Sequence, residues 1–322
     1  MPAAVITAFT TERARGFLGR KVPSMTDVRD AERVANMLAG LCESLVVSWR
    51  QIGRQAGAGA PPDAQVSLDA GDARRSLANR PKNIEYAASQ ISGELVGAIS
   101  LLLQAVATQL RARPLVPLTI WPLVRAELEY AGRVAWLLEP LPGTDAGSRR
   151  VARALLEQLS SLQRGKYTAS KHSGSLAKQR KRERDDLLSS IKSLFSDVHI
   201  PLETPEQIAE WTIGGETMLS LGKANDLFVS LNFTSGKAIY DTLSDHSHPS
   251  IMALARQSVA EESEGMTFTS YPPNDEVLDF QVRLGCLILY KAAHTILGYH
   301  GLDADSLEQW ADTVPPHWFS EN

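Results

Sequence analysis

Two polar rows on otherwise apolar stretches are the residues of this chain best placed to do chemistry. Arg125 and Glu129 lie four apart, a spacing that makes them neighbours on one helix face and permits an ion pair. Tyr240, Ser244 and His248 also recur at steps of four, so one helix would stack a phenol, a hydroxyl and an imidazole. Arginine binds anions bidentately, and histidine carries protons near neutral pH. Together the rows predict a small polar site.

If both rows face the interior, they form a pocket for a small anionic ligand. Arg125 would bind the anion, Glu129 would hold the guanidinium in place, and His248 would respond to pH or ligand. The simpler interpretation of the second row is structural, because Ser244 and His248 could cap a helix end before Pro249. The leading hypothesis is therefore an intracellular helical binding or regulatory protein.

An enzyme is the first alternative, most plausibly a metal-independent nuclease or phosphotransfer-type enzyme of a defence or toxin system. His248 is its candidate catalytic residue, acting as general acid or base. Asp245 and His248 form one Asp-x-x-His pair, but a di-iron bundle needs four carboxylates and two Glu-x-x-His pairs. The chain also lacks glycine-rich nucleotide motifs and the Gly-x-Ser-x-Gly elbow. We therefore expect neither a metal nor a cofactor.

Positive charge is concentrated in one segment. Residues 164–184 contain eight Lys or Arg residues and one acid, a local charge of +7, so the rest carries −11 of the net −4. Lys178, Arg180, Lys181 and Arg182 are the candidates for contact with phosphate, nucleic acid or an acidic protein. Such a run is usually a solvated helix face, so nucleic acid is not the expected partner. A scaffold that docks an acidic protein is the second alternative.

The element that must position Arg125 and Glu129 is a helix over residues 119–140 that is apolar on nearly all sides. Its main apolar stripe consists of Trp121, Val124, Leu128, Ala131, Ala135 and Leu138. Pro122 fits only in the first turn, which places the helix start near residues 119–121. A helix of this kind is usually central. An ion pair inside it costs free energy unless it is well satisfied.

The whole chain reads as an all-α protein, with about ten helices packed around this central helix and no sheet. Helices are expected at 26–54, 83–111, 119–140, 147–162, 176–195, 204–222, 224–245, 249–259, 275–299 and 306–312. The clearest start is a capping box at residues 204–207. In the 147–162 helix, Arg149, Arg150 and Arg153 are expected to face out or back toward the central helix.

Three regions follow from these patterns. Residues 1–54 form an N-terminal helical segment, residues 55–82 an Ala-Gly-rich flexible linker, and residues 83–322 the main helical domain. The longest apolar stretch, 95–110, is shorter than the roughly 20 residues of a membrane span, and no secretory signal opens the chain. Cys42 and Cys286 lack metal-ligand spacing and indicate buried, reduced thiols. We expect a cytoplasmic protein without membrane contact.

Several segments resemble an uncharacterised family of bacterial all-helical proteins. These are Arg-Ala-Glu-Leu-Glu at 125–129, Trp-Leu-Leu-Glu-Pro at 136–140, Arg149-Arg150, and the later row of Tyr240, Ser244 and His248. The resemblance covers residues 115–255 and implies a shared helical fold with a polar cluster, but no particular activity. More remotely the chain is similar to the HEPN ribonucleases of toxin–antitoxin and defence systems. The Arg followed four to six residues later by His, which those enzymes carry, is absent from this sequence.

Overall fold

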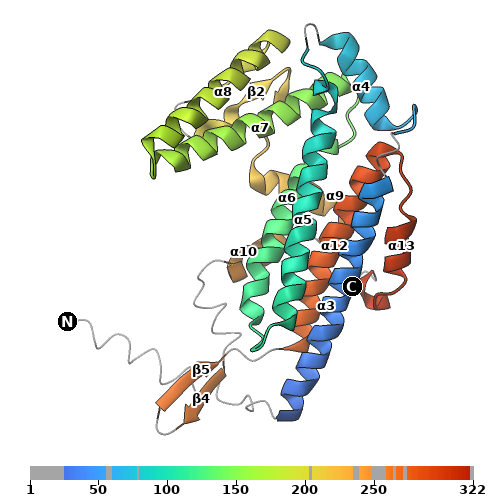
Figure 1. Cartoon of the computed structure of the whole chain (residues 1–322), viewed down its shortest axis with the longest axis vertical. Coiled ribbons are helices and arrows are strands. Elements are labelled where there is room, and N and C mark those ends of the chain that lie inside the picture. Colours follow the sequence, from blue (N-terminus) through green and yellow to red (C-terminus); the bar gives the residue numbers. More distant parts are fainter. Residues whose placement is uncertain are drawn as a thin grey trace, which may run out of the picture.

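The structure is a computed structural model that describes residues 25–55, 60–77, 80–202, 205–234, 239–247, 259–263, 266–270 and 274–319. These residues form ten α-helices, α3 (Met25–Gln55), α4 (Gln65–Ser76), α5 (Ala87–Arg111), α6 (Ile120–Leu138), α7 (Ala146–Ser170), α8 (Gly174–Leu194), α9 (Leu221–Asn232), α10 (Ile239–Ser247), α12 (Asp275–His300) and α13 (Asp305–Ala311). Short 3-10 helices are η2 (Ile84–Tyr86), η3 (Pro117–Thr119), η4 (Pro205–Glu210) and η6 (Pro316–Trp318). The expected mostly helical fold is confirmed (Figure 1).

Helix α6 is the hub of the bundle. It packs against α5, α9, α10 and α12, while α3 packs against α5 and α12. Figure 1 shows α3, α5, α6 and α12 running side by side along the long axis of the molecule. The predicted stripe is buried at every position, at Trp121, Val124, Leu128, Ala131, Ala135 and Leu138. The apolar pattern therefore identified the central helix correctly.

The segment 55–82, which we expected to be a flexible linker, contains helix α4. This helix packs against α7 and α12, and it buries two carboxylates, Asp69 and Asp72, beside its apolar residues. Asp72 Oδ2 accepts hydrogen bonds from the main-chain N–H groups of Gly147 at 2.9 Å and Ser148 at 3.2 Å. Because its inward face is partly acidic, the helix lacks the apolar stripe by which the sequence pattern would have identified it.

A close approach of the two backbones fixes α4 against the start of α7. A Cβ added to Gly147 would lie only 2.0 Å from the carbonyl oxygen of Asp69. Any side chain at this position would therefore push the helices apart. The contact also explains why the Asp72 carboxylate can reach the first N–H groups of α7. A negative charge at this place caps the helix and interacts favourably with the positive end of its dipole.

The expectation that the chain has no sheet is wrong. Strands β1 (Val198–His199), β2 (Thr212–Ile213) and β3 (Glu216–Thr217) form an antiparallel sheet in that order. Strands β2 and β3 interrupt the helix expected over 204–222, of which only η4 and the first residues of α9 are helical. Gly214 and Gly215, with φ of 54° and 78°, make the turn between β2 and β3, a backbone conformation that glycine favours and a helix excludes.

Two further differences concern the later part of the chain. The expected helix 224–245 is two helices, α9 and α10. A second sheet is formed by strand β4 (Val259–Ser263), which pairs with β5 (Met266–Ser270). Almost all of the expected helix 249–259 lies outside the described residues. Helix α7 continues to Ser170 rather than ending near 162, and α8 turns back beside it. This hairpin extends to one side of the bundle (Figure 1).

One helix among the described residues, Ile84–Arg111, is long and apolar enough to cross a membrane by length and composition. Its C-terminal part, α5, packs against α3, α6 and α12. A core helix of a bundle satisfies the same length and composition, so this observation alone identifies no membrane segment.

Candidate functional site

The structure brings together three of the predicted site residues. Arg125 Nε lies 3.0 Å from Glu129 Oε1, and Arg125 Nη2 donates to Tyr240 Oη at 3.4 Å. The guanidinium carbon also lies 5.6 Å from the centre of the Tyr240 ring. The contact joins α6 to α10. It is not in a water-poor interior as expected, because the side chains of Arg125 and Glu129 are 19% and 28% exposed.

Of the other two residues of the second row, the structure describes one. Ser244 is partly buried on α10, whereas His248, the candidate catalytic residue, lies outside the described residues. Another histidine of α10 contacts the central helix, since the His246 ring stacks on Trp121 with centroids 4.4 Å apart and planes 13° apart. The predicted convergence of two rows is therefore observed for the Arg125, Glu129 and Tyr240 side chains.

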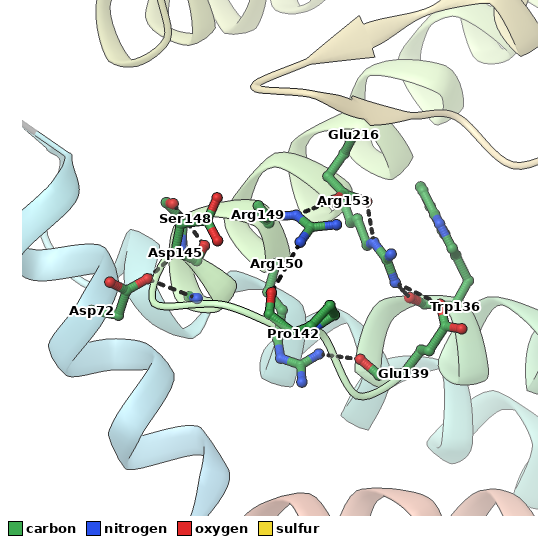
Figure 2. A network of polar contacts seen from close by, with 11 residues as sticks. Asp72, Trp136, Glu139, Pro142, Asp145, Ser148, Arg149, Arg150, Arg153 and Glu216 are labelled. Atoms are coloured by element: carbon green, nitrogen blue, oxygen red, sulfur yellow. Dashed lines mark hydrogen bonds and ion pairs between the residues drawn. The ribbon is translucent and has the colours of Figure 1, made fainter.

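A second set of charged side chains includes two that are more deeply buried, Arg150 and Arg153. We call Arg149, Arg150 and Arg153 of α7 the arginine cluster. Arg149 Nε donates to Glu216 Oε1 at 2.5 Å, and Arg153 Nε donates to Glu216 Oε2 at 2.6 Å. Figure 2 shows both guanidinium groups converging on this carboxylate, while Arg150 extends away toward Glu139. These ion pairs of Glu216 with Arg149 and Arg153 attach strand β3 to α7.

Arg150 forms the centre of a buried network with α4 and α12. Its Nε donates to Asp69 Oδ2, which also accepts from the Tyr299 hydroxyl at 2.9 Å. Gln65 Nε2 donates to the other oxygen of Asp69 at 2.8 Å. Arg150 and Asp69 are only 2% and 3% exposed. Burial and the Asp69 charge raise the pKa of Tyr299, which keeps its hydroxyl protonated as a donor.

The arginine cluster also caps the C-terminal end of α6. Arg150 Nη1 donates to the Glu139 carbonyl at 2.7 Å, and Arg153 Nη1 donates to the Trp136 carbonyl at 2.5 Å. The last carbonyl groups of a helix have no partner within it and carry a partial negative charge. Two guanidinium groups from α7 satisfy them. The sequence had left open whether these arginines face solvent or the central helix, and Arg150 and Arg153 contact the central helix.

A cleft of about 320 Å³ lies against this network. It is lined by residues of α4, the end of α6 and the following loop, the first turns of α7 and the end of α12, namely Gln65, Leu138, Pro140, Leu141, Arg150, Thr295, Gly298 and Tyr299. Small-molecule pockets span roughly 300 to 1,000 Å³ and combine apolar walls with a few polar groups. The cleft has both features, at the lower end of that range.

The arginine of the cleft has hydrogen-bonding capacity to spare. A guanidinium carries five N–H groups, and the described residues accept from two nitrogens of Arg150, Nε and Nη1. Asp69 accepts from Tyr299 and Gln65 as well as from Arg150, so it holds the guanidinium in a fixed orientation. The arrangement can present a rigid cationic donor beside the apolar surface of Leu138 and Leu141.

Glu127 is the most unusual buried group, and the sequence analysis did not predict it as a site residue. Its side chain is 0% exposed on α6, and neither oxygen has a hydrogen-bond partner among the described residues. Burial raises its pKa well above the ordinary value. It lies close to α12, since a Cβ added to Gly285 would come within 2.8 Å of its Oε2. Glu127 follows Val124 by three residues and precedes Ala131 by four. This spacing places it on the apolar stripe and is the sequence signal from which its burial could have been predicted.

The predicted basic residues lie elsewhere. Lys178, Arg180, Lys181 and Arg182 are exposed on α8, and Arg180 Nη1 pairs with Glu183 Oε2 at 2.8 Å. Cys42 and Cys286 are buried free thiols with their Sγ atoms 3.8 Å apart. In the part of the chain that the structure describes, no group of three His, Cys, Asp or Glu side chains is placed to hold a metal ion.

Comparison with known proteins adds no assignment. No family model matches the chain, and no curated protein and no solved structure matches it. The resemblance to a bacterial all-helical family and, remotely, to HEPN ribonucleases stays a prediction.

Proposed function

We propose that this chain is a binding or regulatory protein that takes a small anionic molecule in the cleft beside Arg150. The observation that carries the proposal is Arg150, a buried residue of the cleft lining whose guanidinium is held by Asp69 and the Glu139 carbonyl. A carboxylate bound there would gain charge-assisted hydrogen bonds at little ordering cost, because the donor is already fixed.

The walls of the cleft define the rest of the ligand. Leu138, Pro140 and Leu141 offer apolar surface on one side, whereas Gln65 and Thr295 offer polar groups. A compact molecule with one anionic end and a short apolar body fits this distribution. The anion expected beside Arg125 is thus reassigned to Arg150, and Tyr299 and Gln65 take the supporting positions.

A titration with matched probes tests the proposal. Hexanoate and benzoate should each raise the melting temperature of the protein, since a ligand that binds only the folded state stabilises it. Their uncharged counterparts, hexanamide and benzamide, should have a much smaller effect, because they lack the charge that Arg150 recognises. Equal shifts with acids and amides, or no shift with any probe at millimolar concentration, would contradict an anion site.

A variant that blocks the cleft, compared with a matched control variant, locates the binding site. A Cβ added to Gly298 meets nothing within 4 Å, so Gly298→Leu places an apolar side chain at the lining of the cleft without an initial clash. Gly97 of α5 is equally open around its Cβ and lies outside the cleft lining. We expect Gly298→Leu to remove the shift caused by hexanoate and Gly97→Leu to retain it.

The other functions predicted from the sequence gain less support. The enzyme alternative needs His248, which lies outside the described residues. The cytoplasmic location remains part of the proposal as an expectation. The scaffold alternative depends on the basic helix α8, and no residue of α8 lines the cleft.

A further inference from the structure

The α7–α8 hairpin carries an unbalanced positive charge far from the cleft. Residues 164–182, which we call the basic arm, contain seven Lys or Arg residues and no Asp or Glu. They cover the last turns of α7, the turn at 171–173 and the first turns of α8. Figure 1 shows this hairpin extending to one side of the bundle. Its end is therefore accessible to a large partner.

The exposed side chains of the basic arm form two rows. Arg164 and Tyr167 of α7 and Lys171, which directly follows α7 with helical backbone angles, recur at steps of three and four, so they are neighbours on one face. Tyr167 is 48% exposed, and Lys171 Nζ lies 4.6 Å from the centre of its ring. An exposed aromatic ring thus lies between two cationic side chains.

The row on α8 consists of Lys178, Lys181 and Arg182, which also occupy one flank at steps of three and four. All three are exposed. Among the described residues, no acid forms an ion pair with these three side chains or with Arg164 and Lys171, in contrast to Arg180, which pairs with Glu183.

Such a concentration of like charge favours a polyanionic partner. Lys and Arg side chains that neutralise phosphates release counterions, which drives binding at low salt. Proteins that hold single-stranded nucleic acid combine a basic surface with aromatic rings on which bases stack. An acidic protein would neutralise the charge but would have no need of the exposed Tyr167 ring. The aromatic residue between the charges therefore favours nucleic acid over an acidic protein.

We propose that the basic arm binds single-stranded nucleic acid, with the cations of its two rows contacting phosphates and Tyr167 stacking on a base. This inference is independent of the proposed function, because no residue of the basic arm lines the cleft. Loss of binding to one site leaves the other intact.

Fluorescence anisotropy with the full chain tests this inference. The probes are labelled 20-nucleotide single strands of one mixed sequence, as RNA and as DNA, together with the DNA duplex, each titrated between 50 and 300 mM salt. Binding of either single strand supports the proposal, and the tighter of the two identifies the source. No binding of either strand at 50 mM salt and about 100 μM protein overturns it, since even non-specific complexes typically have Kd values of about 10⁻⁴ to 10⁻⁶ M.

Charge variants locate the binding surface. The triple variant Lys178→Gln, Lys181→Gln, Arg182→Gln should weaken binding at least about tenfold at 100 mM salt and lower the salt slope by about 2, because each single-strand phosphate contact contributes roughly 0.7. Its control is the triple variant Lys82→Gln, Lys192→Gln, Lys223→Gln, which makes the same change in net charge at exposed positions outside the basic arm. Equal weakening by both variants overturns the assignment to the arm.

Tyr167→Ser distinguishes single-strand stacking from charge attraction. It should weaken single-strand binding about five- to tenfold with an unchanged salt slope, because stacking on an aromatic ring is largely independent of salt. Duplex binding should not change. If Tyr167→Ser has no effect, or if polyglutamate of equal charge competes as well as the single strand does, the nucleic-acid proposal is overturned in favour of an acidic protein. Unchanged melting temperatures of the variants confirm that they fold.

Discussion

Arg125 belongs to helix α6 and Arg150 contacts the C-terminal end of that helix, but the two arginines differ in the sequence separation of their partners and in burial. Arg125 pairs with Glu129 one turn away and remains 19% exposed. Arg150 pairs with Asp69, 81 residues away in the chain, caps the end of α6 and is 2% exposed. Arg150 also lines a cleft. A deeply buried, fully oriented charge is the better candidate for a built site.

The difference shows what local spacing can and cannot reveal. A pair at positions i and i+4 is visible in the sequence because helix geometry alone brings the residues together. The Arg150 network needs α4, α7 and α12 to be packed first. A third group, Glu127, is as buried as Arg150 but has no hydrogen-bond partner among the described residues, and burial raises its pKa.

The largest expected effect is on the Arg150 network. Arg150→Met should lower the free energy of unfolding by about 3–5 kcal/mol, because it leaves the buried Asp69 charge without its cation. Urea denaturation measures this loss. The double variant Arg150→Met, Asp69→Leu should lose less than the single variant, since an apolar replacement of both partners removes the unpaired charge.

Arg149→Met is the neighbouring control, because Arg149 is more exposed and shares Glu216 with Arg153. It should cost clearly less than Arg150→Met. If the two single variants lose equal stability, Arg150 is not the centre of the network, and the contrast with Arg125 is weakened.

The next effect concerns Glu127 and depends on pH. Burial raises its pKa in the folded state, so the folded protein retains a proton that the unfolded chain releases as the pH rises above about 4.5. The resulting stability is fully present below that pH and is lost as the pH rises through the folded pKa. Glu127→Gln cannot titrate and should become more stable relative to the wild type with increasing pH, by about 1.4 kcal/mol for each unit of pKa increase that the pH covers.

Denaturation at pH 5 and pH 8 measures this effect, with Glu129→Gln as the partly exposed control on the same helix. The Glu129 variant should show little change in relative stability between the two pH values. A constant difference between Glu127→Gln and the wild type would mean that the Glu127 carboxyl is charged and paired in the folded state.

The smallest effect is expected at the other arginine. Arg125→Ala should lower the free energy of unfolding by at most about 1 kcal/mol, because a partly exposed ion pair at i and i+4 contributes only a few tenths and a cation–π contact about 0.5–1 kcal/mol. Thermal melting of this variant beside Arg150→Met compares the two sites directly. A loss as large as that of Arg150→Met would erase the difference between them.

The fold was largely predictable where apolar periodicity was strong. The central helix, its buried stripe and the long helices α3, α5 and α12 followed from that pattern alone. The pattern failed where polar residues face inward, as in α4 with Asp69 and Asp72. It also failed at 204–222, where η4 ends at Glu210 and is followed by the turn at Gly214 and Gly215 and by paired short strands. Strand pairing is a non-local interaction that no helix-start signal reports.

The site was less predictable for the same reason. The Arg125, Glu129 and Tyr240 contact was foreseen because two rows at helical spacing were visible. The Arg150 network was not, since its partners Asp69 and Tyr299 belong to segments separated from it by 81 and 149 residues. The burial of Glu127 could have been predicted from its place on the apolar stripe, but the prediction considered only the neighbouring pair, Arg125 and Glu129.

We propose that the anion site lies beside Arg150 and not beside Arg125. Isothermal titration of hexanoate into the wild type, Gly298→Leu and Arg125→Ala compares the two places in one measurement. We predict that Gly298→Leu weakens binding by at least about tenfold, a change of about 1.4 kcal/mol, and that Arg125→Ala leaves the affinity within about twofold of the wild type. Unchanged binding by Gly298→Leu together with its loss in Arg125→Ala would contradict the claim.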